Sequence, residues 1–172
     1  LDLVWGQEHM TTNYLTMNYW HDFGAKYIYV SSDITLDEIK EISNLAKSKL
    51  MVQIFGYQPM FTSYRHLVKN YLKTFDIKDN SKEYIIEKEG NSYSIVDDEL
   101  GTTVYSRNIL NGIEEYLELD VEYVILNSYN IDKFEEVIDL FNNVNESNKN
   151  TSKVFTTTGQ AQFEIDKLPV YE

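Results

Sequence analysis

Short apolar runs alternate with amphipathic stretches along this chain, and this alternation limits its fold more than any other feature. The clearest run, residues 50–55, is apolar except at Gln53 and is typical of a strand buried on both faces. Similar runs predict further strands at 3–5, 27–30, 102–106 and 121–126. The amphipathic stretches predict helices near 14–23, 35–46, 109–119 and 134–141. Such alternation indicates parallel βα units.

The helix at 35–46 is the best specified element. Thr35 can cap its amino end, and Glu38 three residues later completes a capping box. Apolar residues then form one stripe along it, at Leu36, Ile39, Ile42, Leu45 and Ala46. The strand at 50–55 follows directly, and Gly56 is expected to end it.

The pattern changes at residues 84–97, which predict a β-hairpin turning at 89–91. We expect an α/β fold that is a portion of a TIM-barrel-like parallel βα fold with this hairpin inserted. A closed barrel needs eight strands and about 250 residues, and the chain opens on Leu1 rather than Met. We therefore expect a piece of a longer protein, able to form a homodimer, with one domain at 1–142 and a flexible Asn-rich loop and tail at 143–172.

Composition excludes several kinds of site. Twenty-eight acidic residues against 15 basic ones give a formal net charge of −13, which repels phosphate backbones, so we expect this piece to bind nucleic acid poorly. The absence of cysteine excludes disulfides, thiolate nucleophiles and cysteine-ligated zinc or iron–sulfur clusters. No apolar run approaches the roughly 20 residues of a membrane span. A soluble, cytoplasmic protein without a cofactor is expected.

The most specific motif is residues 56–71, which read GYQPMFTSYRHLVKNY. This stretch resembles the signature of the collagenase-like peptidase family, peptidase family U32, roughly Gly-Ala-Met-Cys-x-Ser-Tyr-Ser-Gly-Arg-Cys-Leu-Leu-Ser-Asn-Tyr. The residues that agree with it are Gly56, Ser63, Arg65, Leu67, Asn70 and Tyr71. Pro59 and His66 stand where family members carry cysteines.

The resemblance extends over about residues 3–141. The chain departs from it at positions where family members carry cluster ligands and charged residues. Family members carry two more cysteines shortly after the signature, whereas residues 72–83 here contain none. All four ligands expected for an iron–sulfur cluster are thus missing. An Arg-Glu pair of the family is replaced by Ser32-Asp33.

The resemblance implies a role beyond the proteolysis in the family's name. Members resemble factors for oxygen-independent hydroxylation of transfer-RNA uridine or of quinones, and they often work as pairs of paralogous subunits. The chain accordingly looks like the C-terminal part of a cluster-free, non-catalytic subunit that works with a cluster-bearing paralogue. Two alternatives stay open: a peptidase using a metal or a Ser/His site, and a protein-binding domain without chemistry.

Four residues are candidates for catalysis. Glu8 and His9 follow the first strand, where polar residues line a pocket or hold a metal in many α/β proteins, although a strand-to-helix turn explains them as well. Arg65 can bind a carboxylate or phosphate, or form a structural ion pair. His66, like His9, is a weak metal candidate, and space-filling is the simpler explanation.

Two further patterns have simple structural explanations. Asp97 and Asp98 resemble a pair of acid/base carboxylates, but beside a hairpin they are expected to form a solvated turn. Tyr57, Tyr64 and Tyr71 recur every seven residues and can stack on bases, although core or interface packing explains most tyrosines.

Overall fold

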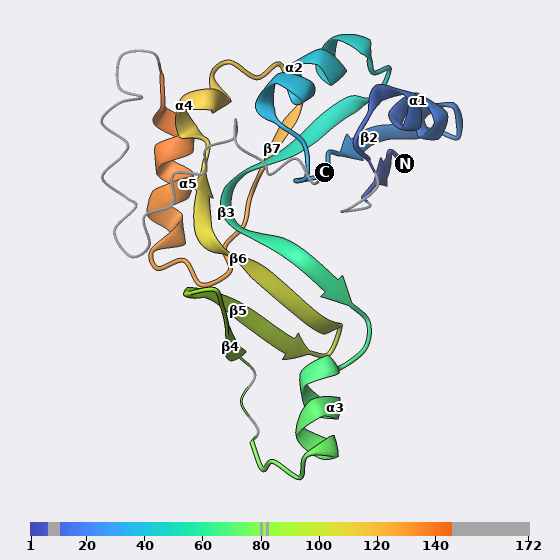
Figure 1. Ribbon diagram of the computed structural model, residues 1–172. Coiled ribbons are helices and arrows are strands. Elements are labelled where there is room, and N and C mark those ends of the chain that lie inside the picture. Colours follow the sequence, from blue (N-terminus) through green and yellow to red (C-terminus); the bar gives the residue numbers. More distant parts are fainter. Residues whose placement is uncertain (7–10, 80, 82, 146–172) are drawn as a thin grey trace.

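The structure, a computed structural model, describes residues 1–6, 11–79, 81 and 83–145 (Figure 1). The strands of this part join one sheet in which the long strand β3 pairs with three others. In chain order they are β1 (Leu3–Trp5), β2 (Ala25–Tyr29), β3 (Lys49–Ser63), β4 (Glu83–Lys88), β5 (Asn91–Asp98), β6 (Gly101–Asn111) and β7 (Tyr123–Leu126). Most of the predicted tail, residues 146–172, lies outside the described residues.

The first part of the sheet is parallel, as the βα pattern predicts. β1 pairs with β2, β2 pairs with the start of β3, and β7 pairs with residues 51–55 of β3. Two helices connect these strands, α1 (Tyr14–Asp22) before β2 and α2 (Leu36–Leu45) before β3. The capping box of α2 is confirmed, since Thr35 Oγ1 accepts from the Glu38 amide and Glu38 Oε2 from the Thr35 amide.

The prediction that β3 ends at Gly56 is wrong. The strand continues to Ser63 because it changes partner there, pairing antiparallel with β6 from Phe55 onward. Gly56 has a φ of 99°, and a Cβ at this residue would lie 2.3 Å from the Asn127 carbonyl oxygen. A glycine is therefore needed where the strand passes from one partner to the next.

The second half of β3 belongs to an antiparallel extension formed with β6, β5 and β4. The predicted hairpin is confirmed: Lys88 pairs with Asn91 across the two-residue turn of Glu89 and Gly90. Helix α3 (Leu67–Thr74) lies at the end of this extension, remote from the parallel strands (Figure 1).

The helix predicted at 109–119 is largely wrong. Residues 109–111 are the end of β6, paired with residues 55–57, and only α4 (Ile113–Tyr116) is helical. Ile109 and Leu110 are thus buried on a strand, whereas Ile113 is buried on α4. The last predicted helix is confirmed as α5 (Phe134–Asn143).

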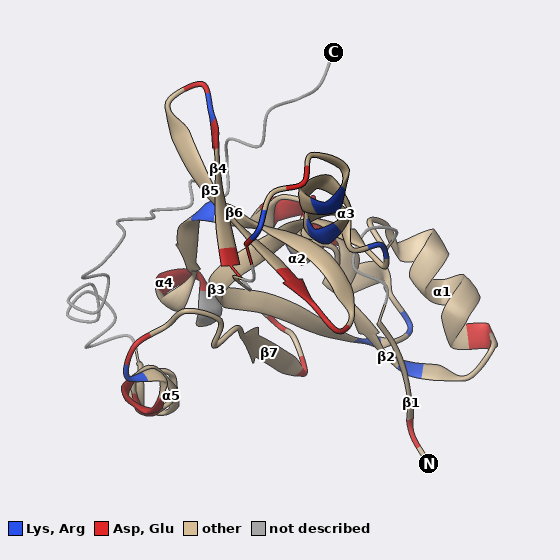
Figure 2. Cartoon of the chain, turned by 90° about the horizontal axis from the view of Figure 1, so that it is seen from below, with Lys and Arg blue, Asp and Glu red and all other residues tan. Residues whose placement is uncertain are grey.

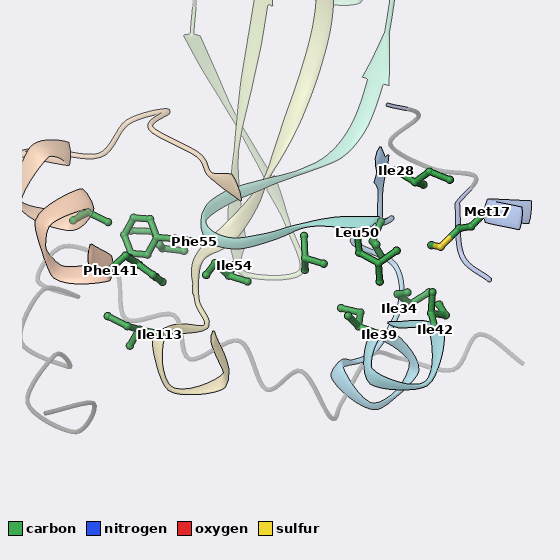
Figure 3. Packing of buried hydrophobic residues seen from close by; sticks show 14 of the residues in the cluster. Met17, Ile28, Ile34, Ile39, Ile42, Leu50, Ile54, Phe55, Ile113 and Phe141 are labelled. Atoms are coloured by element: carbon green, nitrogen blue, oxygen red, sulfur yellow. The ribbon is translucent and has the colours of Figure 1, made fainter. Parts of the chain in front are cut away.

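One apolar core joins helices α1, α2, α4 and α5 to β3 (Figure 3). Ile39 and Ile42 of α2 are buried with Leu50 near the start of β3. Farther along the strand, Phe55 meets Phe141 of α5 with ring centroids 5.9 Å apart. The structure is thus a mixed α/β fold with an open sheet, parallel in its first part and antiparallel in its second. No helix in the described part is long and apolar enough to cross a membrane.

Candidate functional site

A small cavity of about 40 Å³ lies beyond the carboxyl end of β2, beside β3. In parallel α/β sheets, ligands bind at the carboxyl ends of the strands. Polar uncharged side chains share the lining with apolar ones, and the polar ones are Ser31, Ser32, Gln53 and Gln58. Ser32 belongs to the pair Ser32-Asp33, which stands where the family resemblance predicts Arg-Glu. An uncharged lining of this kind can bind a polar group by hydrogen bonds.

The two glutamines of this cavity differ in their hydrogen bonding. Gln53 Nε2 donates to the carbonyl oxygens of Phe55 and Tyr57, and its Oε1 accepts from the Tyr29 hydroxyl at 3.3 Å. Gln58 is 8% exposed, and its carboxamide has no hydrogen bond to any described residue. Gln53 therefore supports the backbone at the bend of β3, whereas the Gln58 carboxamide is available to a bound molecule.

The signature segment forms a second polar cluster, centred on Asp97 of β5. The prediction that Asp97 lies in a solvated turn is wrong, because its side chain is 1% exposed. Its Oδ2 accepts from the backbone amides of Val68 and Lys69 at 3.0 and 3.2 Å. The same oxygen lies 3.2 Å from the hydroxyl of Thr102.

Asp97 therefore does the work of an N-cap for α3. His66, the residue before the helix, makes no side-chain cap of its own. A carboxylate at this end satisfies amides that lack partners within the helix and interacts favourably with the helix dipole. Burial alone would raise the pKa of Asp97, but the hydrogen bonds from Lys69, His66, Thr102 and Val68 outweigh it and lower that pKa.

The two signature candidates take different places in this cluster. His66 Nδ1 lies 2.8 Å from Asp97 Oδ1, so this ring nitrogen is engaged by a carboxylate. Arg65 is exposed, and its carbonyl oxygen accepts from the Thr102 hydroxyl at 2.9 Å. Within the described ranges, no carboxylate lies within ion-pair distance of the Arg65 guanidinium. The other two candidates, Glu8 and His9, lie outside the described residues.

His21 contacts Ser48, but the direction of the hydrogen bond between them does not suit a nucleophilic serine. The Ser48 hydroxyl donates to the Ala25 carbonyl oxygen at 2.7 Å, so His21 Nδ1, at 3.0 Å, faces a lone pair of Ser48. A general base would have to accept that hydroxyl proton. The pair also lies next to the amino end of β3, away from the cavity.

The residues present do not fit the iron–sulfur cluster that the family resemblance implies. Such a cluster is held by thiolates, and the chain contains no cysteine. At the signature, Pro59 is paired within the sheet opposite Tyr105, and His66 is bonded to Asp97. Over the described part of the chain, no group of three or more His, Asp or Glu residues is placed to hold a metal ion.

Sequence reasoning missed Gln58 and the burial of Asp97. The one available signal for the cavity was Gln53, a polar residue inside an apolar run. Of the three tyrosines at sevenfold spacing, Tyr57 is half-buried beside Tyr129, with ring centroids 6.0 Å apart, while Tyr64 and Tyr71 are exposed.

Comparison with known proteins agrees with the signature. The sequence profile of Peptidase family U32 matches residues 4–141. The "tRNA hydroxylation protein P2" of Bacillus subtilis (strain 168) is 35% identical over 133 residues, which cover 71% of this chain and 43% of that protein. The chain thus spans less than half the length of this relative. No solved structure matches it. With a profile match over most of its length, the chain belongs to peptidase family U32.

Proposed function

We propose that this chain is part of a cluster-free subunit that acts in transfer-RNA hydroxylation together with a cysteine-bearing paralogue. The observation that carries the proposal is the 35% identity to a protein named for tRNA hydroxylation, combined with the loss of every cysteine. Without thiolates the chain cannot hold iron and sulfide. A second subunit would therefore supply the redox centre, and a cytoplasmic location follows from the proposed substrate.

The retained signature supports a scaffolding role for this segment. Its histidine, at a cysteine position of the family, meets Asp97, which also caps α3. The segment thus keeps an ordered structure by hydrogen bonds. We assign the cavity with Gln58 as the part of this chain that contacts a polar group of the substrate or of the paralogue.

We further propose that the parallel strands are a portion of a TIM-barrel-like fold. β1, β2, β3 and β7 supply four parallel strands, and a barrel of this type has eight. Leu3 and Val4 on β1 and Tyr123 on β7 are exposed at the two outer strands. The relative is more than twice as long as the matched region, which leaves room for further βα units.

A gene deletion with complementation tests the role. Transfer RNA from the deletion strain is digested to nucleosides, and hydroxylated uridine is measured by mass spectrometry. We expect the modification to fall and to return with the full-length protein. Co-purification should recover a cysteine-bearing paralogue. Unchanged hydroxylated uridine, or a stable full-length protein that associates with no paralogue, would contradict the proposal.

A further inference from the structure

Exposed aromatic side chains gather on and beside helix α3, at Tyr64, Tyr71 and Phe75. Tyr64 is 97% exposed, and Tyr71 and Phe75 are 57% and 61% exposed. The rings of Tyr71 and Phe75 contact each other with centroids 4.7 Å apart. Clustered apolar rings facing solvent mark interaction sites on many proteins.

The same segment is basic in a strongly acidic chain. Residues 64–78 contain four basic residues and one acidic residue, a net charge of +3, while the rest of the chain has 11 basic and 27 acidic residues, a net charge of −16. Figure 2 shows the Lys and Arg colour on α3. Salt screens charges beyond about 8–10 Å. Asp97, which contacts Val68 and Lys69, lies within that distance and lowers the local positive charge by one. A ligand at α3 therefore responds mainly to a local charge of about +2, and much less to the net charge of −13.

The aromatic rings and the lysines of α3 lie on opposite sides of the helix face that packs against the sheet. Val68 and Leu72 are half-buried, and at 100° per residue Tyr71 and Phe75 lie on one side of them. Lys69 and Lys73, also one turn apart, lie on the other side. The outward face between the two pairs is thus bordered by rings and by cations.

Two cations of this surface have no acidic partner among the described residues. Lys69 Nζ lies 3.5 Å from Asp97 Oδ1 and is held by that contact. For Lys73 and Arg65, the described residues offer no carboxylate within ion-pair distance. Phosphate groups are ligands for such exposed cations.

We propose that the outer face of α3, together with Tyr64 and Arg65, binds a single-stranded segment of RNA. Unpaired bases stack on the exposed rings, and phosphates contact Lys73 and Arg65. A protein partner fits less well, because the centres of protein interfaces are depleted of lysine. The identity of the RNA as transfer RNA rests on the proposed function, and the proposal replaces the expectation from net charge that this piece binds nucleic acid poorly.

Fluorescence anisotropy with a labelled 12-mer of uridylate tests the proposal on the full-length protein. Tyr71→Ala should raise Kd about fivefold or more, because base–aromatic stacking is worth 1–3 kcal/mol per base. Tyr71→Trp should retain the affinity, since it keeps a stacking ring. Lys73→Gln should raise Kd and reduce the slope of log K against log salt by about 0.7.

Matched variants on other helices are the controls. Tyr19→Ala removes an exposed ring of α1, and Lys133→Gln removes an exposed cation before α5. Both should leave Kd within twofold. The proposal is overturned if the 12-mer does not bind, if the α3 variants bind as the wild type does, or if the controls weaken binding equally. Circular dichroism of each variant verifies that it is folded.

The complementation experiment separates this proposal from the proposed function. Restored hydroxylation together with an unchanged Kd in the α3 variants would refute the RNA surface alone. If the wild-type protein binds RNA through α3 but does not restore hydroxylation in the deletion strain, the proposed function alone is refuted. If the α3 variants lose a protein partner but keep their RNA affinity, the surface is a protein interface and the proposal is wrong.

Discussion

The His66 ring and the Asp97 carboxylate, 31 residues apart in sequence, meet at an Nδ1–Oδ1 distance of 2.8 Å beside the amino end of α3. The other carboxylate oxygen accepts from two amides of the first turn of that helix. One buried acid on β5 thereby fixes both the signature histidine and the start of α3. Family members carry a cysteine at the position of this histidine, so the contact uses a residue specific to the cysteine-free chain.

Replacing this acid should destabilise the protein. Asp97→Asn keeps the shape but loses the charge and one acceptor, and we expect the free energy of unfolding to fall by about 2–3 kcal/mol. Urea denaturation measures it. Glu99→Gln, an exposed neighbour, is the matched control and should stay within about 0.5 kcal/mol of the wild type. Equal effects of the two changes would contradict the capping role.

The same residue predicts a dependence of stability on pH. The folded-state pKa of Asp97 is lowered from the model-peptide value of 3.8, so its contribution is complete above that value and is lost as the pH falls through the folded pKa. The stability difference between wild type and Asp97→Asn should therefore be constant from pH 7 to about pH 5. It should shrink in stronger acid. Urea midpoints at several pH values test this, and a difference that grows on acidification would refute it.

Gly56 should tolerate no side chain. Gly56→Ala places a Cβ 2.3 Å from the Asn127 carbonyl oxygen at a φ of 99°, and we expect a loss of about 2–5 kcal/mol. Gly90→Ala is the control, since its φ is also positive but nothing lies within 4 Å. It should cost only about 1 kcal/mol. Thermal unfolding compares the two, and a similar shift in Tm for both would show that backbone strain alone matters.

Substitutions of the two cavity glutamines should have different effects: the Gln53 change should lower stability, and the Gln58 change should lower activity. Gln53→Leu removes the Gln53 hydrogen bonds to two carbonyl oxygens and to the Tyr29 hydroxyl. Asn127 still donates to both carbonyl oxygens, so we expect a cost of about 1–3 kcal/mol. Gln58→Leu breaks no hydrogen bond to a described residue and should leave stability within about 1 kcal/mol. In the complementation experiment, Gln58→Leu should nevertheless reduce hydroxylated uridine. Normal modification by this variant would remove the cavity from the functional site.

The sequence predicts local elements well where one segment determines its own structure. The capping box of α2, the apolar run of β3 and the hairpin turn at Glu89 are all local signals, and each is confirmed. The same runs predict the parallel pairing of β1, β2 and β3, because βα units leave few other arrangements.

The failures occur where the partner is distant in sequence. The length of β3 depends on β6, which pairs with its second half, and residues 109–111 read as helical because their apolar spacing does not reveal that pairing. Helix α3 has no local capping signal, since its cap is contributed by Asp97. The same distance hid the burial of Asp97. The candidates Glu8 and His9 stay predictions.

Because β3 lies in both the parallel and the antiparallel parts of the sheet, its register is fixed at each end by different neighbours. A one-residue deletion or insertion between Met51 and Gly56 would turn every following side chain to the opposite face, so that one end could pair correctly only if the other did not. Natural length variation among relatives should consequently be absent from this strand and permitted at the tip of the β4–β5 hairpin, where Gly90 has open space around it.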